Sequence, residues 1–349
     1  MSDPALDTLL LPFDNGLLPW PTSGRVLFLR ARDGVPLYAR PRDALLCEQS
    51  FKPDAEALTR AGFHVTADAS DAGTFPLVLL LPPRQRDEAR ALMARAIAQT
   101  EPGGRVVAAV SNNEGARSAQ DDLARVAGTV ASLSKNKCRV FWTPPLPGNA
   151  DAALVAQWSG LDAPRVLKGE SVPDGFVSRP GVFAWDRIDP ASLLLAKHLP
   201  ADLAGRAADL GAGTGFLTQQ LLQRCAGIHS VDLFEAEARA LDLARRNFAA
   251  SATRAALNFH WHNVTTGVSG NYDVVVSNPP FHANGRADQP ELGRRFISVA
   301  ASILRPGGRL WLVANRHLPY EAELGAQFAR VRTVAEGNGF KVFEAARAS

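Results

Sequence analysis

The sequence has very little cysteine. Its 349 residues include only Cys47, Cys138 and Cys225, and no two of them form a Cys-x-x-Cys pair. This spacing excludes a thioredoxin-like redox motif and does not suit a structural zinc site. We expect three small buried side chains and a reducing, cytoplasmic compartment, where free thiols persist.

Long apolar runs are also missing. No stretch approaches the roughly 20 residues that a membrane-spanning helix needs. The first residues carry neither a basic flank nor an extended apolar core, so we expect no signal peptide. The hydrophobic content of 46% and the charged content of 21% are typical of an ordinary soluble globular protein, and we expect no membrane partner.

Lysine is scarce, since only six of the 38 basic residues are lysine. Arginine suits the recognition of phosphates and bases through its planar guanidinium group, but a genomic codon bias explains the same composition. The net charge of +3 and the isoelectric point near 8.9 are compatible with a nucleic-acid partner without requiring one.

Two segments alternate predicted strands with predicted helices, which is typical of parallel βαβ units. In the first segment, strands are expected at 26–29, 77–81 and 106–110, and helices at 53–61 and 88–100. In the second, strands are expected at 207–210, 228–235, 258–263, 273–277 and 309–314, helices at 217–224, 238–250 and 292–304, and a final hairpin at 331–336 and 341–345. We predict an α/β fold with two tandem Rossmann-like domains, each built on a seven-stranded, mostly parallel sheet.

The two segments also share their order of motifs. Residues 75–83 match 272–280, and residues 101–107 match 305–311. An internal duplication explains this order, although Pro-Gly-Gly turns are common in unrelated α/β sheets. A proline-rich stretch at 144–181 separates the halves, and we place the domains at 1–160 and 161–349.

A glycine-rich loop opens the second half. Gly211, Gly213 and Gly215 follow a predicted strand and precede a predicted helix. Glycines let the backbone approach a ligand closely. The dinucleotide fingerprint needs a further glycine where this chain has Phe216, which argues against a nicotinamide cofactor. A tight turn without a ligand remains the alternative interpretation.

Polar residues follow the next two strands. Glu235 lies at the distance from the loop at which such folds place a ribose-binding carboxylate. Asp232 competes with it, but we expect Asp232 to be solvated or to cap a helix. Asn263 offers an amide to a nucleobase edge or is an ordinary loop residue.

The fourth strand of the second half runs into Asn278-Pro279-Pro280-Phe281. Two prolines cannot continue a ladder of hydrogen bonds, so the strand must end there. The amide of Asn278 and the ring of Phe281 then lie at the carboxyl edge of the sheet, where open α/β folds bind ligands. His262 and His282 are candidate bases nearby, but packing roles suit them better.

The loop, the acid and the Asn-Pro-Pro-Phe motif together resemble class I S-adenosylmethionine-dependent N-methyltransferases. The duplicated first half, Pro180-Gly-Val-Phe183 and Gly339-Phe-Lys-Val342 narrow the resemblance to bacterial ribosomal RNA guanine-N2 methyltransferases. The type that acts on the small subunit is most similar, and the large-subunit type is its near relative. The resemblance is strong from Phe183 onward.

This resemblance implies a set of site residues. Asn278, the Pro279 carbonyl and Phe281 would hold the amine and the base, without a metal ion. The cofactor S-adenosyl-L-methionine would contact Phe183, Ser192, Asp209, Gly211, Gly213, Gly215, Glu235, Asn263 and Asn278. The segment from Asp189 to Ser192 reads Asp-Pro-Ala-Ser where the family pattern is Asp-x-Gly-Ser.

The implied reaction is methylation of the N2 amine of a guanine in ribosomal RNA, most of all 16S rRNA. The same motif is compatible with methylation of a 23S rRNA guanine, of adenine N6 or of a protein glutamine. A non-catalytic RNA-binding assembly factor is a further alternative. We expect a monomer that acts in the small ribosomal subunit. The first half has Arg30 and Arg32 in place of two loop glycines and Leu81 in place of Asn278. We predict that it binds no cofactor and serves as scaffold or RNA-docking surface.

Overall fold

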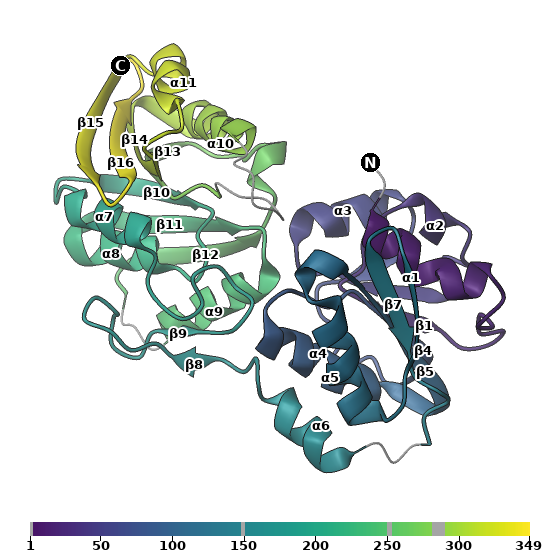
Figure 1. Cartoon of the computed structure of the whole chain (residues 1–349). Helices are drawn as coiled ribbons and strands as arrows, with labels where there is room; N and C mark the ends of the chain where they lie inside the picture. Colours follow the sequence, from purple (N-terminus) through teal and green to yellow (C-terminus); the bar gives the residue numbers. More distant parts are fainter. Residues whose placement is uncertain (1–2, 148–150, 250–252, 281–289) are drawn as a thin grey trace. The chain divides into compact units, whose positions relative to one another are not determined.

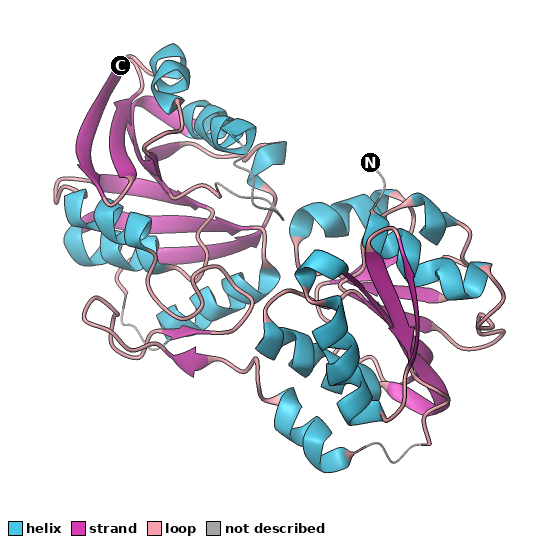
Figure 2. Cartoon of the chain, in the orientation of Figure 1, coloured by secondary structure: helices cyan, strands magenta, loops and turns pink. Residues whose placement is uncertain are grey.

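The computed structural model describes residues 3–147, 151–249, 253–280 and 290–349. The chain divides into two compact units (Figure 1). The first unit comprises residues 1–163 and 179–181, and the second comprises residues 164–178 and 182–349. In each unit helices lie on both faces of a central sheet (Figure 2), so the predicted α/β class is confirmed.

The first unit contains a seven-stranded sheet in the order β3-β2-β1-β4-β5-β7-β6. Its strands are β1 (Val26–Leu29), β2 (Leu45–Glu48), β3 (His64–Thr66), β4 (Phe75–Leu80), β5 (Thr100–Ser111), β6 (Ala131–Lys135) and β7 (Cys138–Trp142). Strand β7 runs antiparallel to both of its neighbours, and the pairs among β1 to β5 are parallel.

Two apolar layers cover the faces of this sheet. One contains α1 (Pro4–Asp14), which begins with the capping side chain of Asp3 followed by a proline, and α3 (Lys52–Arg60). The other contains α4 (Arg86–Ala98), α5 (Ala116–Ala127) and α6 (Ala152–Ser159). The short helix α2 (Val35–Tyr38) follows β1. The proline-rich stretch thus packs into the first unit through α6, where Trp158 is buried.

The second unit repeats the strand order of the first, as β12-β11-β10-β13-β14-β16-β15. Its strands are β10 (Ala204–Leu210), β11 (Gly227–Glu235), β12 (Ala256–Trp261), β13 (Tyr272–Ser277), β14 (Leu304–Asn315), β15 (Arg330–Gly337) and β16 (Phe340–Ala346). The predicted final hairpin is confirmed, since β15 and β16 pair antiparallel and β16 joins β14. Strands β8 (Arg165–Val166) and β9 (Val177–Ser178) form a separate small ladder.

Helices again cover both faces of this sheet. One layer contains α7 (Pro190–His198), α8 (Phe216–Arg224) and α9 (Ala238–Ala249). The other contains α10 (Pro290–Ile303) and α11 (Tyr320–Gln327). Strand β13 is apolar on both faces, as the run of three valines predicts for a central parallel strand.

The two sheets share an irregularity as well as an order. The register between β4 and β5 shifts between Phe75 and Leu77, and the register between β13 and β14 shifts between Tyr272 and Val274. Each shift lies opposite a Pro-Gly-Gly turn that the longer strand contains. A common order with a common irregularity supports the internal duplication.

The three cysteines are buried and carry no disulfide bond, as expected. None of the helices in the described part of the chain has the length and apolarity to cross a membrane.

Candidate active site

Three strand ends meet at one edge of the second sheet. In the parallel ladders, Leu210 pairs with Phe234 on one side and with Ser277 on the other. The next residue on each strand is therefore Gly211, Glu235 or Asn278, all at the same level. The carboxyl edge of β10, β11 and β13 thus brings the glycine loop, the acid and the amide together, as the sequence predicts.

The glycine loop is fastened to the neighbouring strand. The backbone N–H groups of Gly211 and Ala212 donate to the carbonyl of Phe234 at 2.9 and 3.1 Å. Gly215 has a φ of +89°, and a Cβ there would lie 2.8 Å from the ring of Phe248. Gly213 has a φ of +55°, but a Cβ there would meet no described atom within 4 Å. Gly215 therefore leaves room for the ring of Phe248, whereas Gly213 borders space that no described atom fills.

Glu235 is held against this loop by the backbone. Its Oε2 accepts from the N–H of Gly213 at 2.8 Å, and its Oε1 accepts from the N–H of Glu237 at 2.7 Å. Burial raises the pKa of this carboxyl, and the backbone hydrogen bonds oppose that shift. Each oxygen keeps a lone pair that can accept a ligand hydroxyl.

Asp209 lies beneath the loop with no exposed surface. Thr218 on α8 donates its hydroxyl to Oδ2 at 2.7 Å, whereas no described group donates to Oδ1. Burial raises the pKa of Asp209 to about 7, the Thr218 hydroxyl opposes that shift, and the nearby charge of Glu235 adds to it. The site therefore contains an acid that changes charge near neutral pH.

The side-chain amide of Asn278 has hydrogen-bond partners for its nitrogen but none among the described residues for its oxygen. Its Nδ2 donates to Asp189 Oδ2 and to Ser192 Oγ, each at 2.8 Å. Its Oδ1 is buried, and none of the described residues donates to it. A buried acceptor without a donor is costly, so this oxygen is suited to accept an N–H group from a ligand.

A model of the methyltransferase small domain family matches residues 174–344. The second unit is similar to this family over most of its length. This match spans the glycine loop, Glu235 and Asn278, so the edge just described lies within the matched region.

Relatives resemble the chain well beyond this domain. Ribosomal RNA small subunit methyltransferase C of Psychromonas ingrahamii is 28% identical over 288 residues, which cover 82% of this chain and 80% of that protein. The protein of the same name from Shewanella loihica is 29% identical over 270 residues, 77% of each chain.

A solved structure shares the whole architecture. The 16S rRNA N2 methyltransferase RsmC of T. thermophilus, in complex with AdoMet and guanosine, superposes with a TM-score of 0.80. The match has 24% identity and covers 99% of this chain and 92% of that one. Both units of the chain therefore follow one known tandem fold.

The remaining residues that the sequence predicts for the site differ in how exposed they are. Phe183 is 74% exposed, while Ser192 and Pro279 are buried. Asn263 lies beyond the end of β12, so the predicted strand at 258–263 is wrong over its last two residues. Its Oδ1 instead accepts from the N–H and the hydroxyl of Thr265 and begins the 3-10 helix Val264–Thr266. Phe281 and His282 lie outside the described residues.

The interpretation of Asp232 as solvated or helix-capping was wrong. This side chain is buried and accepts from the hydroxyl of Tyr272 and from the amide of Asn258, both at 2.6 Å. Burial works to raise the pKa of Asp232, but the hydrogen bonds from Tyr272 and Asn258 and the nearby guanidinium of Arg206 hold it low. Asp232 therefore joins strands β11, β12 and β13 below the site.

Two residues matter more than the sequence indicates. Asn247 on α9 is buried and bonds to both backbone groups of Val177 and to the carbonyl of Thr214, so it ties the glycine loop to β9. Asp189 anchors the side-chain amide of Asn278.

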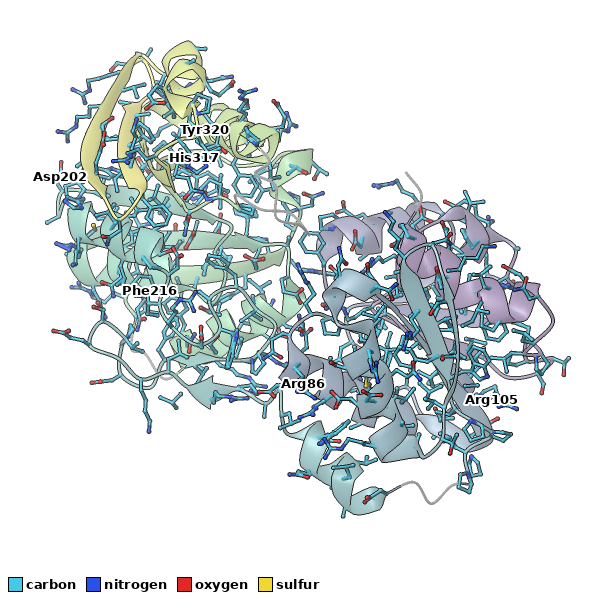
Figure 3. The ribbon with its side chains drawn as sticks, viewed as in Figure 1. Arg86, Arg105, Asp202, Phe216, His317 and Tyr320 are labelled. Carbon is cyan, nitrogen blue, oxygen red and sulfur yellow. The ribbon has the colours of Figure 1, made fainter. Side chains whose placement is uncertain are left out.

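Phe216 begins α8 directly after the loop (Figure 3) and meets Phe176 edge to face at 6.3 Å. Pairing between strand ends and distant helices has no local sequence signal.

The same edge of the first sheet has different residues. Leu29 pairs with Glu48 and with Leu80, so Arg30, Gln49 and Leu81 take the places of Gly211, Glu235 and Asn278. Gln49 accepts from the N–H of Phe51 at 2.9 Å and donates to the carbonyl of Ala31 at 2.6 Å. Its amide therefore bonds to the loop, where Glu235 offers a carboxylate.

Proposed function

We propose that the chain transfers a methyl group from S-adenosylmethionine to the N2 amine of a guanine in 16S ribosomal RNA. The observation that carries the proposal is the unpartnered Oδ1 of Asn278 beside a glycine loop and a fixed carboxylate. The names of the relatives favour small-subunit ribosomal RNA over a protein glutamine. The similar fold solved in complex with AdoMet and guanosine favours guanine over adenine.

The residues at this edge fit the cofactor. The open space beside Gly213 admits the methionine portion, and Glu235 offers lone pairs to the ribose hydroxyls. Asp209 lies beneath the loop, where its ionised form would favour a cationic ligand. Asn263, Ser192 and Phe183 complete the proposed contacts. When bound, S-adenosylmethionine supplies an electrophilic methyl group.

Asn278 activates the amine by position and not by removing a proton. The lone pair of the guanine N2 is delocalised into the ring, which makes it a poor nucleophile. Oδ1 of Asn278 and the carbonyl of Pro279 accept the two N–H groups of this amine. These hydrogen bonds favour tetrahedral geometry at the nitrogen and direct its lone pair toward the methyl group. Such positioning and electrostatic stabilisation supply the rate gain. The methylated nitrogen is acidic and loses its proton to solvent without a dedicated base.

The base must leave its stack to reach this edge. We propose that Phe281 stacks on it, which is worth about 1–3 kcal/mol at comparable sites. We further propose that the chain acts as a monomer on the small ribosomal subunit in the cytoplasm.

We propose that the first unit binds no cofactor and serves as scaffold or as a docking surface for RNA. Gln49 in place of Glu235 cannot offer a carboxylate to a ribose. Arg30 and Arg32, in place of two glycines, form ion pairs with Glu88 at 3.1 Å and Asp3 at 2.9 Å. These side chains fill the loop with contacts made inside the unit.

Replacing Asn278 tests the catalytic proposal. We expect Asn278→Ala to lower methyl transfer by at least about a hundredfold, because an acceptor made only for the reacting amine is lost. The affinity for S-adenosylhomocysteine, measured by calorimetry, should change little. Asn113→Ala, at an amide in the first unit that accepts from Ser111, is the control.

The substrate is identified in the same assay. Tritiated S-adenosylmethionine is supplied with 30S subunits, naked 16S rRNA, 23S rRNA and total protein from a deletion strain. Nucleoside mass spectrometry should find N2-methylguanosine in 16S rRNA. N6-methyladenosine, a labelled 23S rRNA or a labelled protein would contradict the proposed substrate, and full activity of Asn278→Ala would contradict the mechanism.

A further inference from the structure

The amide of Asn278 is held by the beginning of one helix. Its Nδ2 lies 2.8 Å from Asp189 Oδ2, the N-cap of α7, and 2.8 Å from Ser192 Oγ in the first turn of that helix. Both protons of the NH2 group therefore have an acceptor. The Oδ1 atom of the same amide has no described donor.

The chemistry of a carboxylate decides which end of the amide faces α7. A carboxylate accepts hydrogen bonds and cannot donate them, whereas an amide has one donor end and one acceptor end. If the amide were rotated by half a turn, Oδ1 would lie against an oxygen of Asp189, and two acceptors would face each other. Asp189 therefore directs Nδ2 toward the helix and Oδ1 away from it.

Asp189 is itself held in place. Its Oδ2 also accepts from the backbone N–H of Ser192 at 2.8 Å, which caps α7. Helix α7 is anchored in the core of the second unit, where Leu195 has no exposed surface. One oxygen atom thus joins a rigid helix to the amide.

We propose that Asp189, assisted by Ser192, is a positioning residue that keeps Oδ1 of Asn278 directed at the substrate amine. The identity of that amine rests on the proposed function, whereas the orientation of the amide does not. In the sequence this segment stood out only through a resemblance that assigned it to the cofactor. The structure instead assigns Asp189 to the amide that receives the substrate.

Three substitutions separate capping from positioning. Asp189→Ser keeps a good N-cap but withdraws the acceptor from Asn278. Asp189→Asn keeps both the cap and the length, although its own NH2 group permits a rotated amide. Ser192→Ala removes the second acceptor. Asp151→Ser is the matched control, because Asp151 caps α6 by accepting from the N–H of Leu154 at 2.9 Å.

The primary readout is the side-chain amide of Asn278 itself. In protein labelled with 15N-asparagine, the Asn278 NH2 signals are assigned by their disappearance in Asn278→Ala. We expect both proton shifts to move toward those of a free amide in Asp189→Ser, and one of them in Ser192→Ala. Unchanged shifts in Asp189→Ser would overturn the proposal.

Kinetics supply the second readout. We expect kcat to fall about a hundredfold in Asp189→Ser and about tenfold in Asp189→Asn, because misdirection of a reacting group by an ångström costs on this order. The KM for RNA and the affinity for S-adenosylhomocysteine should stay within about twofold of the wild-type values. The melting temperature should change by no more than a few degrees. A loss of S-adenosylhomocysteine affinity that parallels kcat would overturn the proposal, since Asp189 would then act on the cofactor.

A double variant provides the last check. Asp189→Ser should reduce activity no further when it is added to Asn278→Ala, because a residue that acts only through Asn278 has nothing left to position. An additional loss would overturn the proposal. If the wild-type protein methylates no ribosomal RNA but the amide signals shift as expected, the proposed function fails and the positioning role stands.

Discussion

Asp209 shows how a single side chain couples the site to pH. It has no exposed surface, and its pKa is raised to about 7. The unfolded chain releases this proton near pH 4, whereas the folded chain keeps it until about pH 7. Folding therefore becomes less favourable as pH rises through this window, by roughly 4 kcal/mol for an isolated group with such a shift.

The substitution Asp209→Asn removes this dependence while keeping an acceptor for the Thr218 hydroxyl. We expect the variant to gain stability relative to the wild type between pH 4 and 7, and the difference to be constant above pH 8. Urea unfolding at a series of pH values measures it. Asp242→Asn, at a side chain that is 64% exposed, should parallel the wild type; a parallel profile for Asp209→Asn would contradict the assigned pKa.

Single residues also show what a sequence can and cannot reveal. Asn278 and Glu235 are predictable because each lies at the carboxyl end of a strand, and strand ends of a parallel sheet meet at one edge. The burial of Asp232 was not predictable, since Tyr272 and Asn258 reach it from strands β13 and β12. A local pattern carries no information about such partners.

At the scale of elements, the glycine loop combines two kinds of constraint. Gly215 leaves room for Phe248, and Gly213 leaves room for a ligand. Both adopt the left-handed conformation, which costs other residues about 1–2 kcal/mol. The same substitution at the two positions therefore separates packing from binding.

We expect Gly215→Ala to lower the free energy of unfolding by roughly 2–4 kcal/mol, because backbone strain adds to the contact with Phe248. Gly213→Ala should lower the free energy of unfolding by only about 1 kcal/mol. It should, however, lower the affinity for S-adenosylhomocysteine at least about tenfold. Thermal unfolding and calorimetry measure the two effects. Equal losses of stability, or unaltered affinity in Gly213→Ala, would refute this division of roles.

Many elements of regular pattern were predicted well, but the helices α1 and α5 were missed, and so were several short or irregular strands. The strands β1, β10, β11 and β13 and the helices α8 and α10 match the sequence within a few residues. The three-residue strand β3 is too short for a period to be visible, and β6 has mainly exposed side chains. Both are edge strands, which form because a neighbour offers its free backbone groups.

At the scale of the whole molecule, one architecture occurs twice with unequal sites. Gln49 and Glu235 occupy equivalent places in the two sheets, and each accepts from the backbone N–H two residues ahead. This hydrogen bond is thus common to both units, while the carboxylate at this place belongs to the second unit.

This inequality predicts the binding stoichiometry of the intact chain. We expect calorimetry to show one S-adenosylhomocysteine per chain. Glu235→Ala should remove detectable binding, because the ribose loses its acceptor, whereas Gln49→Ala should leave the affinity within about twofold. Binding of a second S-adenosylhomocysteine per chain would contradict the proposal that the first unit binds no cofactor. A loss of binding in Gln49→Ala would contradict it as well.

Arg30 adopts a φ of +55°, the left-handed conformation that Gly211 adopts at the matching place in the second unit. An arginine has no intrinsic preference for this geometry, so the fold imposes it and the ion pair with Glu88 accompanies it. The two loops therefore share this backbone conformation at one position, but Gly34 has an extended φ of 173° where Gly215 has a φ of +89°. A protein engineer who places glycine at 30 and 32 and glutamate at 49 would therefore still have to change the backbone at Gly34 to reproduce the glycine loop of the second unit.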